Sequence, residues 1–263
     1  MPDQPSVPTV VQCASWREFA HGRLVDLLHG SAGDLIFRGH ADSRWPLESS
    51  LVRLIRSERD TFIFDDLEDA ATWSVAEFSR GMLEAGISPA LAGDELAVQA
   101  LAQHYGMPTS LLDWSLSPYT AAFFAFSEIA REQVSSEQVA IWMLDTQSAL
   151  VEQVEFPIDQ RMGKLVLCKP GIFGNDRLRN QFGCFTLLRS ELSSVESYIG
   201  RNLSKGDCSP LTKFLVPAGD ADEALTELAY MGLNDGQLFP GVEQLGMRSA
   251  LRLRERVRQR HRA

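Results

Sequence analysis

The sequence lacks the motifs that mark several large enzyme classes. It contains no Walker loop, no GxGxxG after an expected strand, no GxSxG elbow, no HExxH and no paired carboxylates of a metal site. In known enzymes these patterns supply a phosphate-binding loop, a dinucleotide-binding turn, an activated serine or a bound metal. Their absence argues against P-loop, Rossmann, α/β-hydrolase and zinc-protease chemistry, and it predicts no metal site.

Cysteine is scarce and long apolar runs are absent. The four cysteines show no CxxC or Cys/His ligand spacing and are widely separated: Cys13, Cys168, Cys184 and Cys208. We therefore expect reduced thiols rather than a disulfide framework or a zinc site. No apolar run approaches the roughly 20 residues of a membrane span, and the first residues lack the basic and apolar regions of a signal peptide. These absences predict a cytoplasmic protein with no membrane contact.

The net charge of −10 is unevenly distributed along the 263 residues. Residues 248–263 contain seven arginines and one glutamate, +6, so the preceding residues sum to −16. An acidic body is a poor general binder of nucleic acid, although the basic tail alone could contact phosphates or an acidic partner. A solvated last helix, whose cations favour its C-terminal end, is the simpler explanation of the tail.

No repeat and no flexible linker divides the chain. We predict an N-terminal extension and helix at 1–30, a central domain at 31–247 and a basic helical tail at 248–263. Helices are expected at 15–30, 65–81, 94–104, 117–130, 176–180 and 221–231, strands at 34–39, 109–113, 139–145, 165–170, 183–188 and 212–217, and a turn around 234–235. Because strands and helices do not alternate strictly, the pattern predicts an α+β fold.

One polar stretch, residues 101–125, interrupts the apolar pattern. It joins a helix that ends near His104, a tight turn at Gly106 and Pro108, a short strand and a helix capped by Ser117. Each polar group buried there without a partner would cost about 1–3 kcal/mol. The stretch is therefore either a functional site or a structural corner.

Thr109 and Asp113 are our candidates for holding this corner and Arg38, because backbone groups at such junctions need partners. The remaining candidates for a functional role are His104, Tyr105 and Trp114. A triad of Ser110, His104 and Asp113 can also be drawn. We do not favour it, because a helix end and a strand separate its members and no strained elbow presents the serine.

Two further polar residues stand at the ends of expected strands. Arg38 ends the first strand, and Gly39 after it allows close backbone approach. A fixed guanidinium fork suits a phosphate or carboxylate ligand, and the alternative is a structural pair with a carboxylate such as Asp113. Gln181 precedes a later strand, where it could hydrogen-bond a ribose hydroxyl or cap the backbone.

Phe37, Arg38 and Gly39 open a series of motifs that resembles the FRG domain, a bacterial domain family named for its Phe-Arg-Gly sequence. Similar motifs follow in order: Trp45, Leu47, Arg53, Gln103, His104, Tyr105, Gly106, Pro108, Thr109, Leu111, Leu112, Asp113, Trp114, Ser117, Pro118, Ala122, Phe124, Ala125, Arg177, Gln181, Gly183 and Phe185. The stretches ELAYMGL and LFP complete the series. Two positions depart from the family's usual residues: His40 replaces Gln, and Ser110 replaces an Arg.

Beyond this family, the motif order is similar to that of ADP-ribosyltransferases. The resemblance implies a split mixed or antiparallel β-sheet of the ADP-ribosyltransferase type with surrounding helices, which binds NAD as its substrate. Arg38 would meet NAD from the first strand, residues 113–118 would lead the second strand into a helix, and the third would supply a glutamate at or near Cys184. No carboxylate stands there. Gln181, three residues earlier, can hold a ribose hydroxyl without supplying negative charge.

The resemblance also implies roles for the candidate residues. The catalytic candidates are Arg38, His104 and Gln181. The NAD-binding candidates are Arg38, Gly39, His40, Tyr105, Thr109, Asp113, Trp114 and Ser117. In this hypothesis Arg38 contacts the pyrophosphate, Tyr105 or Trp114 stacks on nicotinamide, and Gln181 holds the ribose.

These roles imply an NAD-consuming enzyme, an ADP-ribosyltransferase or NAD glycohydrolase, acting as a bacterial toxin or phage-defence effector by analogy with relatives. The acceptor could be protein, nucleic acid or water. The missing glutamate supports an alternative, a non-catalytic sensor of nucleotides or nucleic acid on the same fold. A protein-interaction module is a third hypothesis.

Overall fold

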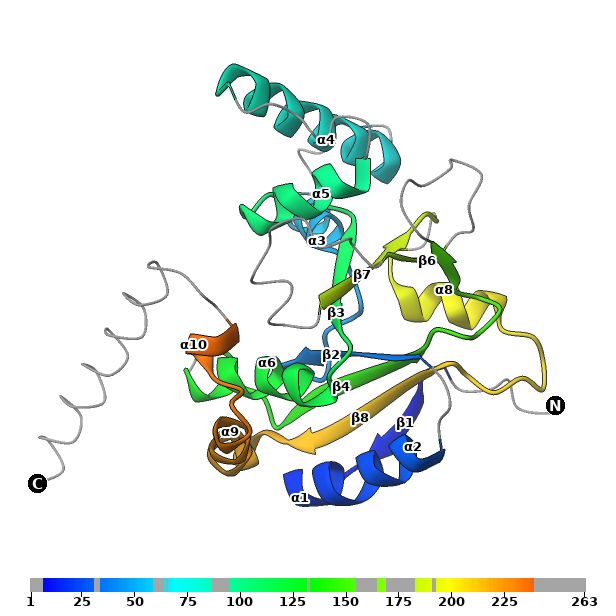
Figure 1. Cartoon of the computed structure of the whole chain (residues 1–263). Helices are drawn as coiled ribbons and strands as arrows, with labels where there is room; N and C mark the ends of the chain where they lie inside the picture. The colour runs from blue at the N-terminus through cyan, green and yellow to red at the C-terminus, as the bar shows by residue number, and fades with distance from the viewer. Residues whose placement is uncertain are drawn as a thin grey trace, which may run out of the picture.

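A mixed eight-stranded sheet organises the chain (Figure 1). The computed structural model describes residues 7–30, 34–58, 64, 66–86, 95–131, 133–154, 165–168, 183–190 and 193–238. The strand order is β1 (Thr9–Gln12), β8 (Leu211–Pro217), β4 (Gln138–Asp145), β2 (Leu35–His40), β3 (Leu111–Ser115), β7 (Gly183–Leu188), β6 (Leu165–Cys168) and β5 (Glu152–Val154). β1–β8 and β5–β6 are parallel and the other neighbours are antiparallel, so the predicted α+β fold with a mixed sheet is confirmed.

The sheet consists of two halves that meet at a single residue pair. β2 and β3 are in register only where Phe37 faces Ser115, whereas β2 pairs with β4 along its whole length and β3 does the same with β7. Past that one pair, β2 and β3 diverge, because right-handed twist accumulates where cross-strand hydrogen bonds do not hold two strands together. The sheet therefore curls, and it opens between its two central strands.

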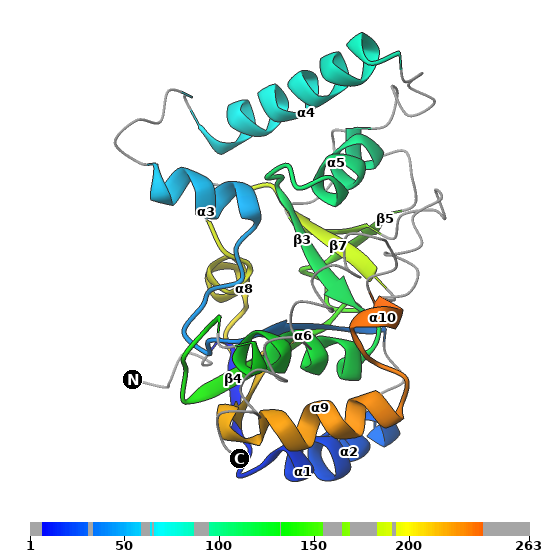
Figure 2. The ribbon, with the colours of Figure 1, turned by 90° about the vertical axis from the view of Figure 1, so that its left-hand side faces the viewer.

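Helices pack against both halves of the sheet. They are α1 (Trp16–Glu18), the π-helix η1 (Phe19–Arg23), α2 (Leu24–Gly30), α3 (Ser50–Ser57), α4 (Leu67–Glu84), α5 (Glu95–His104), α6 (Pro118–Ala130), α8 (Val195–Asn202), the 3-10 turn η3 (Ala218–Asp220), α9 (Ala221–Tyr230) and α10 (Asp235–Leu238). The apolar cluster that includes α8 joins the two halves. In Figure 2, α3, α4 and α5 lie at one end of the molecule and α1, α2 and α9 at the other, with α6 between them.

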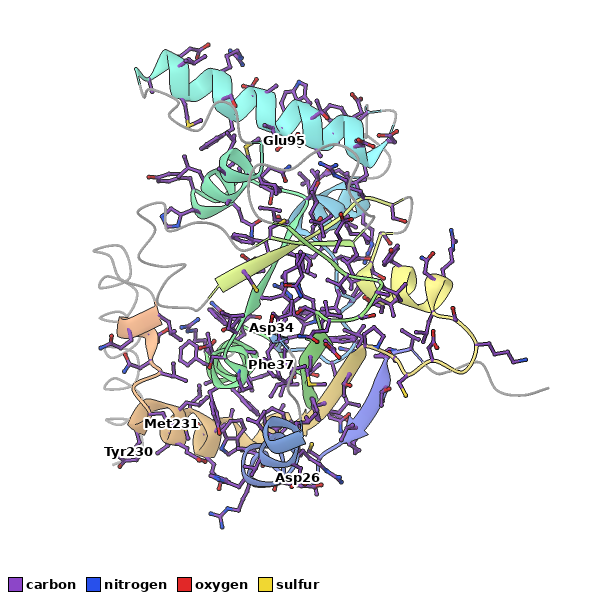
Figure 3. All side chains as sticks on the ribbon, turned by 45° about the vertical axis from the view of Figure 1, so that its right-hand side comes forward. Asp26, Asp34, Phe37, Glu95, Tyr230 and Met231 are labelled. Atoms are coloured by element: carbon purple, nitrogen blue, oxygen red, sulfur yellow. The ribbon has the colours of Figure 1, made fainter. Side chains whose placement is uncertain are left out.

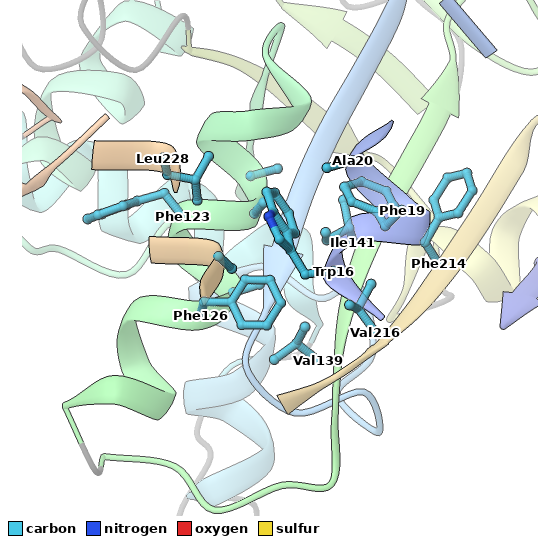
Figure 4. Close-up of a cluster of buried hydrophobic side chains, with 14 of the residues drawn as sticks. Trp16, Phe19, Ala20, Phe123, Phe126, Val139, Ile141, Phe214, Val216 and Leu228 are labelled. Atoms are coloured by element: carbon cyan, nitrogen blue, oxygen red, sulfur yellow. The ribbon is translucent and has the colours of Figure 1, made fainter. Parts of the chain in front are cut away.

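The half of the sheet formed by β1, β8, β4 and β2 packs against the N-terminal helices, α6 and α9 through one apolar cluster (Figure 4). Trp16 is fully buried in it, and its indole donates a hydrogen bond to Glu227 of α9 at 2.7 Å. Residues 9–30, predicted as an N-terminal extension, thus contribute an edge strand and core side chains to the same sheet. Figure 3 shows Phe37 inside the molecule, while Tyr230 and Met231 lie at the outer end of α9.

Most predicted elements are confirmed within a few residues, and the differences have physical causes. The helix expected at 15–30 is capped by Ser15 as predicted, but its middle winds as a π-helix. The turn expected around 234–235 is a single helical turn, α10, because the Asn234 side chain accepts hydrogen bonds from the backbone NH groups that open it. β1, β5, α3 and α8 were not predicted. The helix expected at 176–180 and the tail 248–263 lie outside the described residues.

The other expectations concern the thiols and the membrane. No disulfide joins the four cysteines, and only Cys208 is exposed. Among the described residues, no helix combines the length and the apolar character needed to cross a membrane.

Candidate functional site

A pocket of about 310 Å³ opens where β2 and β3 diverge. Its walls come from β2, α5, β3, α6 and β7, and α5 and α6 cover the two halves of the sheet on either side of it. Five residues predicted from the sequence line it: Arg38, Gly39, His104, Asp113 and Trp114. The polar stretch 101–125 and the Phe-Arg-Gly strand therefore meet in one place.

Arg38 is fixed in this pocket by its neighbours. Its Nη1 donates to the Asp113 carbonyl oxygen at 2.7 Å and lies 3.9 Å from that residue's carboxylate. Its Nε donates to Nε2 of His40 at 3.0 Å. Burial lowers the pKa of the guanidinium and Asp113 partly opposes this, but an arginine remains a cation at neutral pH. The side chain is 18% exposed, so the site holds a preset positive charge that reaches the pocket.

His40 is buried beside Arg38 and does not line the pocket. Because the guanidinium can only donate, Nε2 of His40 must accept, and Nδ1 must carry the proton and face the Trp45 carbonyl oxygen at 3.3 Å. The Trp142 indole nitrogen, 3.2 Å from Nδ1, is then a contact rather than a hydrogen bond. Burial, and next the charge of Arg38, hold the pKa of His40 well below its ordinary value. A residue predicted to bind NAD thus orients Arg38 instead.

Gly39 sets the distance between β2 and α6. A Cβ atom there would lie 1.9 Å from the Ala121 carbonyl oxygen and 2.8 Å from the Ala125 backbone nitrogen. Only glycine allows this approach, which brings α6 to the edge of the pocket. The close approach expected at this residue is to a helix of the chain itself.

Gln103 joins the end of α5 to β3. Its amide nitrogen donates to the Asp113 carboxylate at 2.7 Å, and its amide oxygen accepts from the Thr109 hydroxyl. Thr109 is buried and also accepts from the Leu111 backbone NH at 3.3 Å. These bonds agree with the structural role expected for Thr109 and Asp113. Gln103, which also lines the pocket, belongs to the motif series of the sequence but was not among the predicted site residues.

Of three other predicted binding residues, only Trp114 lines the pocket, and it is almost completely buried. The Trp114 side chain is 3% exposed, and its indole donates to the Thr186 hydroxyl at 2.8 Å within the core. Ser117 caps α6 by accepting from the Thr120 backbone NH at 3.2 Å. Tyr105 is 73% exposed and lies outside the pocket lining. The geometry thus offers neither aromatic residue as a stacking platform for nicotinamide.

The β7 wall is apolar where it is described. Phe185 lines the pocket, whereas Cys184 is buried in the core cluster beneath the sheet, paired in register with Trp114. A carboxylate at position 184 would therefore face the core. Gln181 lies outside the described residues.

Glu128 is a charged pocket residue that sequence reasoning missed. It stands on the face of α6 that also carries Ala121 and Phe124 into the pocket. Its carboxylate is half-buried, and desolvation raises its pKa, opposed by the charges of Arg131 and Arg38. The signal was present in the sequence: seven residues after Ala121, an acidic residue falls on the same side of an otherwise apolar helix.

The structure does not assemble the serine triad. Ser110 lines a separate cavity of about 20 Å³, whereas His104 and Asp113 line the larger pocket. Within the described ranges, no group of His, Cys, Asp and Glu could hold a metal ion.

Fold and site together define an α+β protein with a pocket of mixed polar and apolar lining where its two central strands diverge. Residues 33–134 match the family model of the FRG domain, which supports the FRG family for this part of the chain. The matched segment contributes four of the five pocket walls, β2, α5, β3 and α6. Comparison with curated proteins and with solved structures gave no match.

Proposed function

We propose that this protein is an NAD-consuming enzyme that transfers or hydrolyses ADP-ribose. The observation that carries the proposal is the pocket itself, in which a fixed arginine and two carboxylates meet between diverging strands. Arg38 supplies the positive charge that a pyrophosphate requires. Asp113 and Glu128 supply negative charge, which cleavage of the nicotinamide–ribose bond requires, because its transition state resembles an oxocarbenium ion.

The size of the pocket limits how the dinucleotide would bind. About 310 Å³ is at the lower end of the roughly 300–1,000 Å³ typical of ligand pockets. It suits the nicotinamide–ribose half of NAD with the pyrophosphate at Arg38, and it leaves the adenosine half outside. His104, exposed at the end of α5, stands at the pocket wall where an acceptor could approach.

A sheet split between β2 and β3 is also what the proposed relationship to ADP-ribosyltransferases requires. By the same analogy we propose a role as a bacterial toxin or phage-defence effector in the cytoplasm. The second candidate function is a non-catalytic nucleotide or nucleic-acid sensor. It is favoured by one observation, the absence of a pocket-facing carboxylate from the described residues of β7.

The test is incubation of the purified protein with NAD, alone and with protein or nucleic-acid acceptors, followed by chromatographic measurement of nicotinamide. Arg38→Ala removes the fixed cation, and Arg17→Ala, on an exposed helix surface, is the matched control. We expect release by the wild type and by Arg17→Ala, and a rate about 100-fold or more lower in Arg38→Ala.

Calorimetry with NAD and ADP-ribose separates the two candidate functions. Binding without nicotinamide release would favour the sensor. A protein that neither releases nicotinamide nor binds either compound would refute both the NAD-consuming enzyme and a sensor of these nucleotides.

A further inference from the structure

Glu128 differs from the other charged pocket residues because no described residue holds its carboxylate. The Asp113 carboxylate holds Gln103, and Arg38 holds the Asp113 carbonyl. The Glu128 carboxylate, by contrast, makes no hydrogen bond or ion pair with any residue that the structure describes. A half-buried carboxylate without such a partner destabilises the fold, because it has lost part of its hydration. A ligand that donates a hydrogen bond or carries positive charge would compensate for this loss.

The position of Glu128 relative to Arg38 indicates which part of a ligand it meets. The two side chains line the same pocket and attract each other electrostatically, but Arg38 is within 4 Å of the Asp113 carboxylate and not of Glu128. Gly39 holds α6 against β2, so both charges are carried on rigid elements packed in direct contact. The pocket therefore carries a positive charge on Arg38 and a negative charge on Glu128, and these two groups do not form an ion pair with each other.

We propose that Glu128 is a catalytic residue that contacts the nicotinamide–ribose end of NAD, while Arg38 contacts the pyrophosphate. This inference rests on the proposed function. Glu128 accepts a hydrogen bond from a ribose hydroxyl and stabilises the positive charge that develops beside it. It supplies from helix α6 the negative charge that β7 does not supply in its described residues.

The chemical step is balanced with water as the acceptor. The bond between ribose C1′ and nicotinamide N1 breaks, and its electron pair leaves with nicotinamide, which departs as a neutral molecule. The positive charge passes to C1′ and the ring oxygen of the ribose. Water adds to C1′ and loses a proton to Glu128 or to solvent, which gives ADP-ribose.

The same placement predicts selectivity for the oxidised dinucleotide. The nicotinamide ring of NAD⁺ is a cation and that of NADH is neutral, so a carboxylate close to the ring favours NAD⁺. One charge–charge contact of this kind corresponds to about a tenfold preference at a partly exposed site.

The experiment compares wild type, Glu128→Gln and the control Glu137→Gln, which removes the same charge from an exposed loop. Calorimetry gives the affinities for NAD⁺ and NADH, and chromatography gives the rate of nicotinamide release. We expect Glu128→Gln to release nicotinamide about 100- to 1,000-fold more slowly and to lose the preference for NAD⁺. Glu137→Gln should match the wild type in both measurements.

The outcomes separate this inference from the proposed function. Wild-type rate and selectivity in Glu128→Gln would overturn the role of Glu128 alone. A wild type that binds neither dinucleotide would overturn both proposals, and one that binds without turnover would overturn the catalytic role. A thermal melt of Glu128→Gln close to the wild type shows that the fold is intact. Glu128→Asp, which keeps the charge, should retain the preference for NAD⁺.

Discussion

Replacement of Gly39 by alanine tests whether the close contact of β2 with α6 builds the pocket. The added Cβ would lie 1.9 Å from the Ala121 carbonyl oxygen, whereas ordinary contacts of this kind lie at 3.4–4 Å. Both partners are backbone, so no side chain can rotate away. Strand and helix must therefore separate locally by about 1.5 Å, the difference between these distances.

The expected loss of stability follows from this geometry. Overpacking a core costs about 1–3 kcal/mol, and a clash with backbone belongs at the upper end of that range. Alanine recovers about 0.4–1 kcal/mol by restricting the unfolded chain. The net loss in the free energy of unfolding is therefore about 2 kcal/mol. For a chain of this size it lowers the melting temperature by about 4–8 °C.

Urea unfolding followed by circular dichroism measures this change, with a thermal melt as a second readout. Gly81→Ala in α4 is the matched control, because its Cβ would meet nothing within 4 Å and alanine stabilises an exposed helix position by about 1 kcal/mol. If Gly39→Ala is as stable as the wild type, β2 and α6 are not in the contact described, and the reasoning about the pocket wall is wrong.

Three further predictions concern buried polar groups. The pKa of His40 is depressed in the folded state, so the stability contributed by the neutral imidazole is complete above about pH 6.5 and is lost as the pH falls below that value. Thermal melts from pH 7.5 to 5 should therefore show a smaller fall in melting temperature for His40→Gln than for the wild type. Trp114→Phe removes the indole that donates to the buried Thr186 hydroxyl, and it should lower the free energy of unfolding in urea by about 1–3 kcal/mol. A change under about 0.5 kcal/mol would contradict this hydrogen bond. Burial raises the pKa of the Cys13 thiol to about 11, and Cys208 is exposed. A thiol reagent at pH 8 should therefore modify Cys208 quickly and Cys13 only when the protein unfolds. Mass spectra taken at successive times measure the two rates.

The elements that the sequence predicted well are those with strong local signals. The apolar run of β4, the Ser117–Pro118 start of α6 and the Gly106 end of α5 each depend on residues close together in the chain. β1 and β5 were missed because they are short edge strands, each stabilised by one parallel neighbour that lies outside its own local pattern. Local pattern carries no information about such a partner.

The candidate site was predictable in part for the same reason. The sequence placed Arg38 on the first predicted strand and His104 at a helix end, and both residues line the pocket. The strand end expected at Arg38 was wrong, because pairing with β4 continues to His40. The sequence could not show that His40 faces inward to hold Arg38, or that Trp114 faces the core, because each depends on which face of a strand is covered by another part of the chain.

The sequence by itself determined the α+β class, the polar stretch and the residues that match the FRG family, since periodicity, caps and motifs are properties of neighbouring residues. The tertiary structure decided that the sheet opens between β2 and β3 and that Glu128 joins Arg38 there. The physical reason is that a single cross-strand pair and the close approach of α6 at Gly39 are contacts between segments far apart in the chain.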